Sequence, residues 1–352
     1  MSVIKRDMAH EIVADGSAHV TLQTVAKLAR VSPSTVSRIL NGTAGVSQAK
    51  RDSVEDAIRV LGFRPNQIAR SLAGGRTMTV GVLTQYIDSP FYGAGIRGIE
   101  DVLTEAGYAP IVTSGFWDIR QERDRVQSLL ARRVDGLIIL TSRLPDEELL
   151  EIANQLPVVV TGRGLESPCL QTLNVDNVNA GWTAAKHLIN LGHQDLAVIT
   201  GPPDHQDSDE RLKGIWLAIE GHGGTVDQGL IVPGDYNEQG GHRAMRQIIS
   251  RNQSFTGVVT LNDQMAFGAM LALQQAGLRV PDDISVVGMD DVAHSAYTIP
   301  PLTTVSLPMH DIGRRAATML LDVLSGPDKS MHSEILETSM IIRGSTRRLS
   351  VK

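Results

Sequence analysis

Cysteine and aromatic residues are scarce in this chain. Among 352 residues Cys169 is the only cysteine, and aromatic side chains make up 4%. A single cysteine excludes an intramolecular disulfide and a cysteine-rich metal site, and we expect it to be a small apolar filler. No apolar run approaches the roughly 20 residues that cross a bilayer. The first nineteen residues lack the apolar segment of a secretory signal, so we expect a flexible extension and a cytoplasmic protein without a membrane partner.

Catalytic signatures are missing as well. The sequence contains no G-x-S-x-G, P-loop or H-E-x-x-H motif, and its ten histidines follow no ligand spacing. We therefore expect neither an enzyme nor a resident metal or cofactor. The length, in contrast, exceeds that of one typical core, so two or three domains are expected.

The charge is unevenly distributed along the chain. Residues 1–76 hold 11 Lys and Arg against 6 Asp and Glu, whereas residues 77–352 hold 22 against 33. The first segment therefore carries +5 and the remainder −11. A basic head on an acidic body suits a head that contacts phosphate and a body that stays away from it.

The basic head has the pattern of three short helices. Thr21 is a suitable N-cap for a helix over residues 22–29, and Ser32 followed by Pro33 begins a second helix that ends near residue 40. Ser47 is the expected cap of a third helix. Apolar residues at helical spacing would close a small core, and they are Val25, Ala26, Leu28, Val36, Ile39, Leu40, Val54, Ala57, Ile58 and Leu61.

The second helix carries a polar face opposite its apolar one. This face consists of short polar groups and one guanidinium, from Ser34, Thr35, Ser37, Arg38 and Asn41. Arg can donate to guanine in the major groove, and Ser and Thr can reach bases or phosphates. The pattern predicts a DNA-binding head, although a generic three-helix bundle with a polar surface has a similar pattern.

After residue 77, apolar runs alternate with helical stretches. The first series is T-V-G-V-L, A-P-I-V-T-S, V-D-G-L-I-I-L-T and L-P-V-V-V-T-G. Following a helix near residues 180–191, a second series is D-L-A-V-I-T-G-P, G-L-I-V-P-G-D, T-G-V-V-T-L-N-D and D-I-S-V-V-G-M-D-D. Continuous apolar strands between helices are typical of parallel sheets covered on both faces. Two such series predict an α/β core of two similar lobes.

Ligands of parallel sheets bind beyond the carboxyl ends of the strands. That rule selects residues 85–92, Arg163, residues 202–211, Tyr236, Asn262 with Asp263, and Asp290 with Asp291. Arg, Asp and Asn side chains with a few aromatic rings suit the hydroxyls and C–H faces of a neutral sugar. Structural explanations also exist: Asp290 and Asp291 can cap the next segment, and Arg211 can form a surface ion pair.

The head contains T-V-A-x-x-A-x-V-S-x-x-T-V-S-R-I-L-N-G, then V-S, then G-F-R-P-N-x-I-A-R-S-L-A-G. In these motifs it resembles the DNA-binding domain of the lac/galactose repressor family of transcriptional regulators. The resemblance implies that Pro33 and Ser34 occupy variable base-reading positions. It implies more constant DNA contacts at Thr35, Ser37, Arg38 and Asn41, and we include Thr21 in the DNA-contacting set. Pro33 has no side-chain donor, so the bases that are read are not predicted.

The segment after the head has the pattern of a short helix over residues 66–73, ended by two glycines. A helix of about eight residues is marginal alone in water. The family resemblance implies that it folds when two copies pair over the operator, with Leu72 in the minor groove and with Asn66 and Ala69 in the same DNA-contacting segment. An apolar wedge of this kind bends DNA. A buried linker leucine is the other interpretation of Leu72.

The body contains G-H-Q-D-L-A-V-I-T-G-P, R-L-K-G, N-D-Q-M-A-F-G-A-M, D-I-S-V-V-G-M-D-D and I-P-P-L-T-T-V. In these segments it resembles the effector-binding core of the same family, which is similar to periplasmic sugar-binding proteins. The resemblance implies a ring of effector contacts formed by Phe91, Tyr92, Arg163, Asp207, Arg211, Tyr236, Asn262 and Asp290. It also favours Met309 as a residue of the pocket floor.

The sequence thus predicts a small all-α helix-turn-helix DNA-binding domain and a two-lobed α/β core with parallel sheets, like that of periplasmic binding proteins. The expected divisions are residues 1–19, 20–65, 66–76, 77–346 and 347–352. The expected function is repression of carbohydrate uptake or catabolism genes, with a mono- or disaccharide effector releasing a homodimer from double-stranded, palindromic operator DNA. The C-terminus lacks the heptads that join two dimers in some relatives, so a dimer is the expected end state.

Two alternatives to a sugar-released repressor stay open. In the first, a purine-like corepressor strengthens DNA binding, because Phe91 and Tyr92 can stack on a base as readily as on a sugar. In the second, the chain is a sugar-binding protein of transport, which the body alone permits. The basic head opposes the second alternative.

Overall fold

The computed structural model describes residues 20–40, 45–63, 75–165, 167, 170–203, 205–224, 227–326 and 333–349. Contacts between residues divide the chain into two compact units, residues 1–77 and 78–352, which we call the head and the body. The predictions for the N-terminal extension and for the end of the tail lie outside the described residues. So do those for Asn41, Asn66, Ala69, Leu72 and Cys169.

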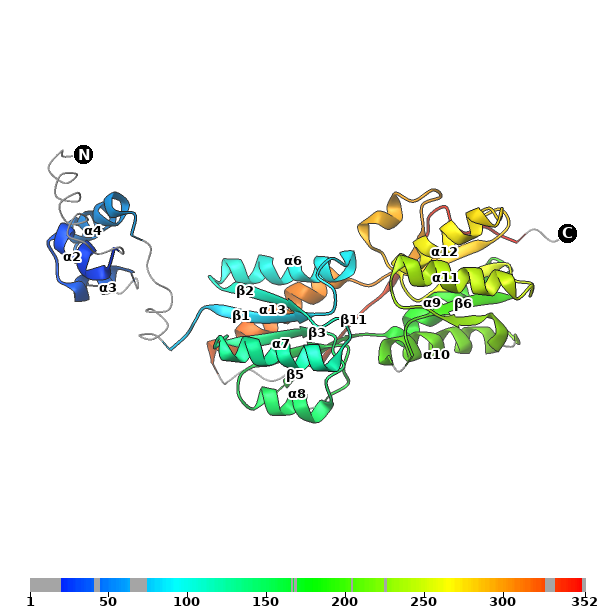
Figure 1. The fold of residues 1–352 in the computed structure, drawn as a ribbon, viewed down its shortest axis with the longest axis horizontal. Coiled ribbons are helices and arrows are strands. Elements are labelled where there is room, and N and C mark those ends of the chain that lie inside the picture. The colour runs from blue at the N-terminus through cyan, green and yellow to red at the C-terminus, as the bar shows by residue number, and fades with distance from the viewer. Residues whose placement is uncertain are drawn as a thin grey trace. The chain divides into compact units, whose positions relative to one another are not determined.

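Three helices make up the described part of the head, at the places that the sequence predicts (Figure 1). They are α2 (Leu22–Ala29), α3 (Pro33–Leu40) and α4 (Gln48–Leu61). Thr21 caps α2 in a reciprocal capping box with Thr24, and Ser32 Oγ accepts the backbone N–H of Thr35 at the start of α3. Ser47 stands at the N-cap of α4, as predicted, but its side chain makes no capping hydrogen bond.

One apolar cluster holds the three helices of the head together. Val25 of α2, Val36 of α3 and Val54 of α4 are fully buried in it. Full burial of such a side chain is worth about 1.5–3 kcal/mol. The apolar stripe of α3 therefore faces inward, and its polar side chains remain on the outer face.

The first lobe of the body is built on a six-stranded parallel sheet. Its strands are β1 (Thr79–Thr84), β2 (Ala109–Ser114), β3 (Gly136–Leu140), β4 (Val158–Thr161), β5 (Leu170–Val175) and β11 (Ser333–Leu336). Their order is β11-β5-β4-β3-β1-β2, with every neighbouring pair parallel. Helices α6 (Pro90–Glu105) and α13 (Met309–Ser325) pack on one face. Helices α7 (Ile119–Ala131) and α8 (Asp146–Ala153) cover the other.

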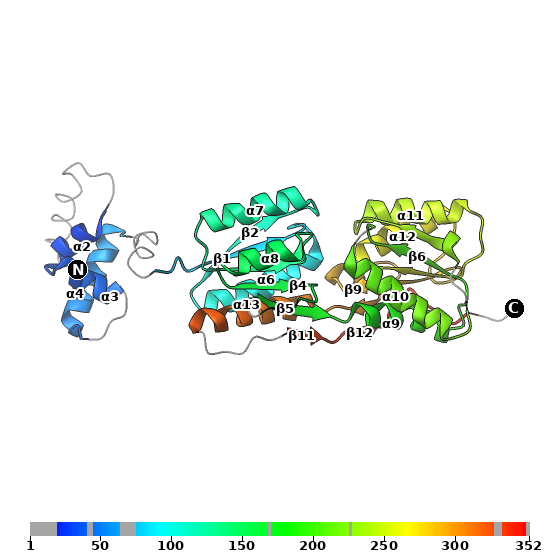
Figure 2. The same ribbon diagram turned by 90° about the horizontal axis from the view of Figure 1, so that it is seen from below.

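The second lobe repeats this architecture. Its strands are β6 (Leu196–Thr200), β7 (Ile231–Pro233), β8 (Gly257–Thr260), β9 (Ser285–Asp290), β10 (Thr303–Ser306) and β12 (Ser339–Ile341). Their order is β12-β10-β9-β8-β6-β7, with β12 antiparallel to β10. Helices α9 (Asn177–Asn190) and α10 (Gln206–Glu220) lie together on one side of the sheet, and α11 (Glu238–Ser250) and α12 (Asp263–Gln275) on the other (Figure 2). Short 3₁₀ turns η1 (Gln228–Leu230) and η2 (Ala293–Ala296) complete the lobe.

The chain passes between the lobes three times, from β5 to α9, from β10 to α13 and from β11 to β12. The two lobes are therefore interleaved along the sequence. Helix α13 returns to the first lobe and packs closely on α6. A Cβ at Gly313 would collide with the backbone of Gly95, so glycine is required at this contact. Three connections therefore join the two lobes.

All eight apolar runs of the sequence form strands, namely β1 to β4 and β6 to β9. Strands β5, β11 and β12 were not expected. In the described parts of the chain, no helix combines the length and the apolar character needed to cross a bilayer.

Candidate functional site

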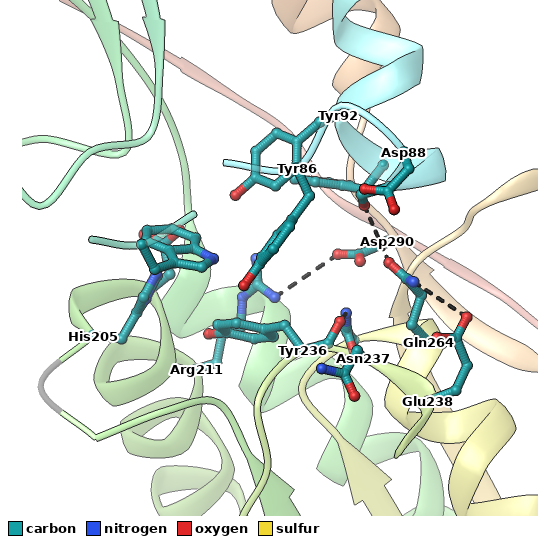
Figure 3. Close-up of a pocket in the computed structure, with 15 residues that line it drawn as sticks. Tyr86, Asp88, Tyr92, His205, Arg211, Tyr236, Asn237, Glu238, Gln264 and Asp290 are labelled. Carbon is teal, nitrogen blue, oxygen red and sulfur yellow. Dashed lines mark hydrogen bonds and ion pairs between the residues drawn. The ribbon is translucent and has the colours of Figure 1, made fainter. Parts of the chain in front are cut away.

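A cavity of about 280 Å³ lies between the two lobes (Figure 3). The residues that line it lie at or just after the carboxyl ends of β1, β2, β6, β7, β8 and β9. This is where parallel sheets are expected to bind ligands. The lining residues are Tyr86, Asp88, Ser89, Phe91, Tyr92, Trp117, His205, Asp207, Arg211, Tyr236, Asn237, Glu238, Asn262, Gln264 and Asp290.

Seven of the eight predicted effector contacts belong to this wall, namely Phe91, Tyr92, Asp207, Arg211, Tyr236, Asn262 and Asp290. Arg163 does not, and the structure corrects its expected position. The Asn174 side chain of β5 bonds both backbone polar groups of Arg163. The guanidinium donates to the carbonyls of Ser142 and Leu144 and pairs with Asp146 at 3.3 Å. Arg163 therefore fastens the loop after β3 instead of facing the cavity.

Met309 also lies elsewhere than expected. Its side chain packs against Gly95 of α6 and belongs to the apolar cluster of the first lobe. It is 5% exposed and is not among the residues that line the cavity. Met309 therefore holds α13 to α6 and forms no part of the pocket floor.

Arg211 supplies the positive charge of the cavity wall. Its Nε donates to Asn177 Oδ1 at 2.9 Å, and its Nη1 donates to the carbonyl of Leu261 at 2.5 Å. Nη1 also lies 3.8 Å from Asp290 Oδ1, and the two side chains are 6% and 4% exposed. A charge this deeply buried is costly unless it is paired and hydrogen-bonded. The three contacts meet that requirement and fix the guanidinium on the inner face of α10.

Two carboxyl groups lie near this guanidinium, that of the buried Asp290 and that of the half-buried Asp207. Asp207 lies in the first turn of α10 and accepts a hydrogen bond from Asn177 Nδ2. Asp290 ends β9. Burial raises the pKa of both carboxyls above the ordinary value, and the charge of Arg211 opposes this shift without cancelling it. Mutual repulsion between the two carboxylates contributes to the raised pKa of Asp290.

The backbone at Asp290 is strained. Asp290 and Asp291 have φ values of 114° and 56°, which side-chain-bearing residues seldom adopt. Arg343 holds Asp291 through an Nη2–Oδ1 contact of 2.7 Å, so the turn is fastened from outside the cavity. Backbone strain of about 1–3 kcal/mol persists where the surrounding structure enforces it, and it concentrates at functional sites. Here the turn keeps the Asp290 carboxylate in the cavity wall.

Aromatic side chains are concentrated in the wall. The whole chain has five Tyr, five Phe and three Trp, and five of these thirteen line one cavity. The rings of Phe91 and Tyr92 meet edge to face with centroids 5.3 Å apart. The ring of His205 lies edge to face with two others. Its centroid is 4.3 Å from that of Trp117 in the first lobe and 5.2 Å from that of Tyr236 in the second. Such rings offer stacking faces to a ligand.

Trp117 is the aromatic residue that sequence analysis missed. It follows β2 in a turn in which Phe116 and Trp117 have φ values of 56° and 55°. The fully buried Gln85 holds this turn, because its Oε1 accepts the backbone N–H of Trp117 at 2.7 Å and its Nε2 donates to Thr141 O. Applying the strand-end rule to β2 as well would have selected Trp117.

Some polar atoms of the wall have no partner. Both ring nitrogens of His205 and the hydroxyl of Tyr236 are buried without a hydrogen bond to any described residue. Burial, together with the charges of Arg211 and Arg143, lowers the pKa of His205 to about 4, so its ring is neutral near pH 7. Burial also raises the pKa of Tyr236, whose hydroxyl stays protonated. Buried polar groups without partners are costly, and a ligand in the cavity can satisfy them.

A short hydrogen-bond chain bridges the mouth of the cavity. Ser89 Oγ, before α6 of the first lobe, donates to Gln264 Oε1 of α12 at 3.1 Å. Gln264 Nε2 then donates to Glu238 of α11 at 3.2 Å (Figure 3). Asn262 and Asn237 cap α12 and α11 with their side chains. Sequence analysis missed Asn237, Glu238 and Gln264, although each lies within two residues of a selected position.

The head presents a second candidate surface on α3. Pro33, Ser34 and Arg38 are exposed, and Thr35 and Ser37 are half-buried. The hydroxyls of Ser34 and Thr35 each lie 2.8 Å from Ser32 Oγ. The outer face of α3 is therefore polar and carries the exposed guanidinium of Arg38. Nowhere among the described residues do three His, Cys, Asp or Glu side chains converge as a metal site would require.

Comparison with known proteins matches both parts of the chain. Residues 21–66 match the lacI family of bacterial regulatory proteins, and residues 185–346 match a periplasmic binding protein-like domain. The chain is 34% identical to the HTH-type transcriptional repressor CytR of Escherichia coli strain K12 over 330 residues, which cover 94% of this chain and 97% of CytR.

Solved structures give the same result. A lac repressor dimer bound to operator and the anti-inducer ONPF is 30% identical, with a TM-score of 0.84 over 93% of this chain and 99% of that chain. A complex of the transcriptional regulator CelR with cellobiose is 33% identical, with a TM-score of 0.70 over 93% of this chain and 100% of that chain. The similarity includes both the head and the body. The chain therefore belongs to the lacI family of bacterial regulatory proteins and is a DNA-binding transcriptional repressor.

Proposed function

We propose that this repressor leaves its operator when a small carbohydrate binds in the cavity between the lobes. The observation that carries the proposal is the buried pair of Arg211 and Asp290, with the half-buried Asp207 beside it, in a cavity walled by aromatic rings. Guanidinium and carboxylate groups bind vicinal hydroxyls in pairs, and rings stack on the C–H faces of a sugar. The cellobiose complex of the related CelR supports a mono- or disaccharide as the class of effector.

Operator reading is assigned to the outer face of α3. Its exposed Pro33, Ser34 and Arg38 suit the entry of α3 into the major groove. The proposed DNA contacts in the head are Thr21, Pro33, Ser34, Thr35, Ser37, Arg38 and Asn41. Three more, Asn66, Ala69 and Leu72, belong to residues 66–76, which we call the hinge segment. The last three and Asn41 lie outside the described residues and rest on the sequence motifs.

The proposed assembly is a homodimer on a pseudo-palindromic operator, because a two-fold dimer presents its two heads to two matching half-sites. The second lobe has an apolar surface that a second copy can cover. Leu271, Tyr297 and Ile299 are 49%, 85% and 97% exposed. An open groove between α11 and α12 lies beside Leu271, and Ser295 ties the loop of Tyr297 to Asp263 at the start of α12. Exposed apolar side chains of this size on one lobe favour a protein interface.

Coupling between effector and operator is proposed to act through lobe closure. The bridge from Ser89 to Gln264 and the contact of Trp117 with His205 both join the lobes across the cavity. A sugar between the lobes stabilises the closed arrangement, which shifts the first lobes of the two copies and unpairs the hinge segments. A difference of a few kcal/mol would suffice, because a helix as short as the one that the sequence predicts over residues 66–73 is marginal alone in water. The regulated genes would then serve uptake or catabolism of that sugar.

Fluorescence anisotropy of labelled operator DNA tests this function. We expect one class of sugar to weaken the binding of the wild-type protein. Asp290→Ala should bind operator but no longer respond, whereas Glu147→Gln, an exposed change on α8, should respond as the wild type does. A full response by Asp290→Ala would contradict the pocket assignment. A ligand that strengthens operator binding would instead indicate corepression.

A further inference from the structure

The cavity wall holds more acidic than basic side chains. Its described residues contribute four carboxylates, from Asp88, Asp207, Glu238 and Asp290, against the single guanidinium of Arg211. The neutral ring of His205 adds no positive charge near pH 7. Asp88 and Glu238 are exposed, whereas burial raises the pKa of the inner Asp207 and Asp290, so a cation placed against these two groups would favour their ionised forms.

The two inner carboxyl groups accept few hydrogen bonds from the described residues. Among the described residues, no donor hydrogen-bonds to either oxygen of Asp290, whose nearest cationic atom is Arg211 Nη1 at 3.8 Å. Asp207 accepts one hydrogen bond, from Asn177 at 3.2 Å. An ionised carboxylate has about four acceptor positions, and leaving them empty in a buried site is costly. A ligand that brings both donors and positive charge would compensate this deficit.

Neighbouring cations are already engaged. Arg211 donates hydrogen bonds from Nε to Asn177 and from Nη1 to the Leu261 carbonyl. Arg163 acts on Asp207 from a distance, but its guanidinium binds two backbone carbonyls and the Asp146 carboxylate. Neither side chain can turn towards the carboxylates without breaking these bonds. Among the described residues, Arg211 alone forms an ion pair with Asp290, and no cationic side chain hydrogen-bonds to Asp207, so the acidic groups of the cavity are compensated only in part.

Two further observations point to a ligand rich in donors. His205 is 9% exposed, and neither of its ring nitrogens has a partner among the described residues. One nitrogen of a neutral imidazole accepts a hydrogen bond. The aromatic wall of Tyr86, Tyr92, Trp117 and Tyr236 also offers ring faces, which attract cations.

We propose that the effector is an amino sugar whose protonated amine lies against Asp207 and Asp290. This inference rests on the proposed function, because it names the class of sugar that the same cavity takes. The sugar hydroxyls donate to His205 and accept from Arg211, while the amine supplies three donors and the missing positive charge. The cavity volume of about 280 Å³ lies at the lower limit of ligand sites, roughly 300–1,000 Å³, and thus favours a monosaccharide.

Isothermal titration calorimetry with the full-length protein tests the charge of the ligand. Glucosamine, galactosamine and mannosamine are compared with their parent hexoses and their N-acetyl forms at about pH 6, where an aliphatic amine is protonated. We expect one hexosamine to bind roughly tenfold more tightly than its hexose and its N-acetyl form. A hexose that binds as tightly as its hexosamine would contradict this inference alone. No binding by any sugar of the panel would contradict the proposed carbohydrate effector as well.

Charge-removing variants locate the amine. Asp207→Asn and Asp290→Asn keep the shape of the side chain and remove its charge. Each should bring the ratio of hexosamine to hexose affinity close to one, whereas Glu147→Gln should keep the wild-type ratio. A wild-type ratio in both Asn variants would contradict the assignment of the amine to these carboxylates. Because the comparison of charged and acetylated ligands uses the wild-type protein, the inference stays testable even if a variant does not fold.

Discussion

The two lobes contribute different chemistry to one cavity. The first lobe supplies Tyr86, Asp88, Ser89, Phe91, Tyr92 and Trp117, which are mostly rings and include one rim carboxylate. The second lobe supplies His205, Asp207, Arg211, Tyr236, Asn237, Glu238, Asn262, Gln264 and Asp290, which include the buried ion pair and most of the hydrogen-bonding groups. Under the proposed function, we expect the second lobe to hold the polar groups of the ligand and the first lobe to cover its apolar face.

Removal of the guanidinium in the second lobe should have the largest effect. Arg211→Ala leaves the buried Asp290 without its cation, a change that typically costs about 3–5 kcal/mol. We expect effector binding to fall by more than about 100-fold while operator binding persists. Calorimetry measures the first and anisotropy the second. If the variant keeps its effector affinity within about threefold, the claim that the second lobe holds the ligand is contradicted.

Removal of a ring in the first lobe should have a smaller effect. Trp117→Ala deletes a stacking face and its contact with His205, worth about 0.5–1.5 kcal/mol beyond the buried area. We expect effector affinity to fall roughly tenfold. The matched control is Trp182→Ala on α9, since that tryptophan is 40% exposed and does not line the cavity. Equal losses in both variants would argue for a general loss of stability.

The hydrogen-bond chain from Ser89 through Gln264 to Glu238 tests how contacts between the lobes affect effector binding. Gln264→Ala removes both hydrogen bonds at the mouth of the cavity, each worth about 0.5–1.5 kcal/mol. We expect a roughly fivefold weaker effector affinity, because the closed form loses its link between Ser89 and α12. Gln274→Ala, exposed on the same helix, should bind the effector as the wild type does. Tighter effector binding by Gln264→Ala would show that the bridge opposes closure.

The smallest expected effect is a pH dependence of stability that comes from the ring of His205. His205 has a pKa of about 4 in the fold, against an ordinary value of 6.5, because burial disfavours its charge. Between these values the unfolded chain binds more protons, so this stability is present above pH 6.5 and is lost as the pH falls towards 4. We expect His205→Gln to lose less stability between pH 7 and pH 5 than the wild type, by on the order of 1 kcal/mol. Thermal melts of both proteins, with His294→Gln as an exposed control, measure the difference; equal losses would place the ring in solvent.

The helices of the head and the main strands of the body could be predicted from sequence because each depends on local pattern. Thr21 and Ser32 cap helices α2 and α3 as predicted, and continuous apolar runs became buried strands. Strands β5, β11 and β12 escaped prediction because polar residues interrupt their apolar pattern. The return of α13 to the first lobe is a matter of topology, which no local pattern encodes.

The candidate site could be predicted in part, for a related reason. The strand-end rule selected residues such as Arg211, Tyr236 and Asp290, since the ends of parallel strands converge. It could not show that the guanidinium of Arg163 binds Ser142, Leu144 and Asp146, because these residues are distant in sequence. The left-handed backbone of Trp117 is likewise held by the distant Gln85, and such conformations are uncommon for residues other than glycine.

Reciprocal linkage between the two ligands tests the central claim most directly. If the effector in the cavity releases the operator, each ligand must weaken the binding of the other by the same factor. We therefore propose to measure the affinity of the wild-type protein for its effector by calorimetry, with and without saturating operator DNA. The account predicts weaker effector binding on the operator, by the factor by which the effector lowers operator affinity. Equal effector affinity in both states would contradict it.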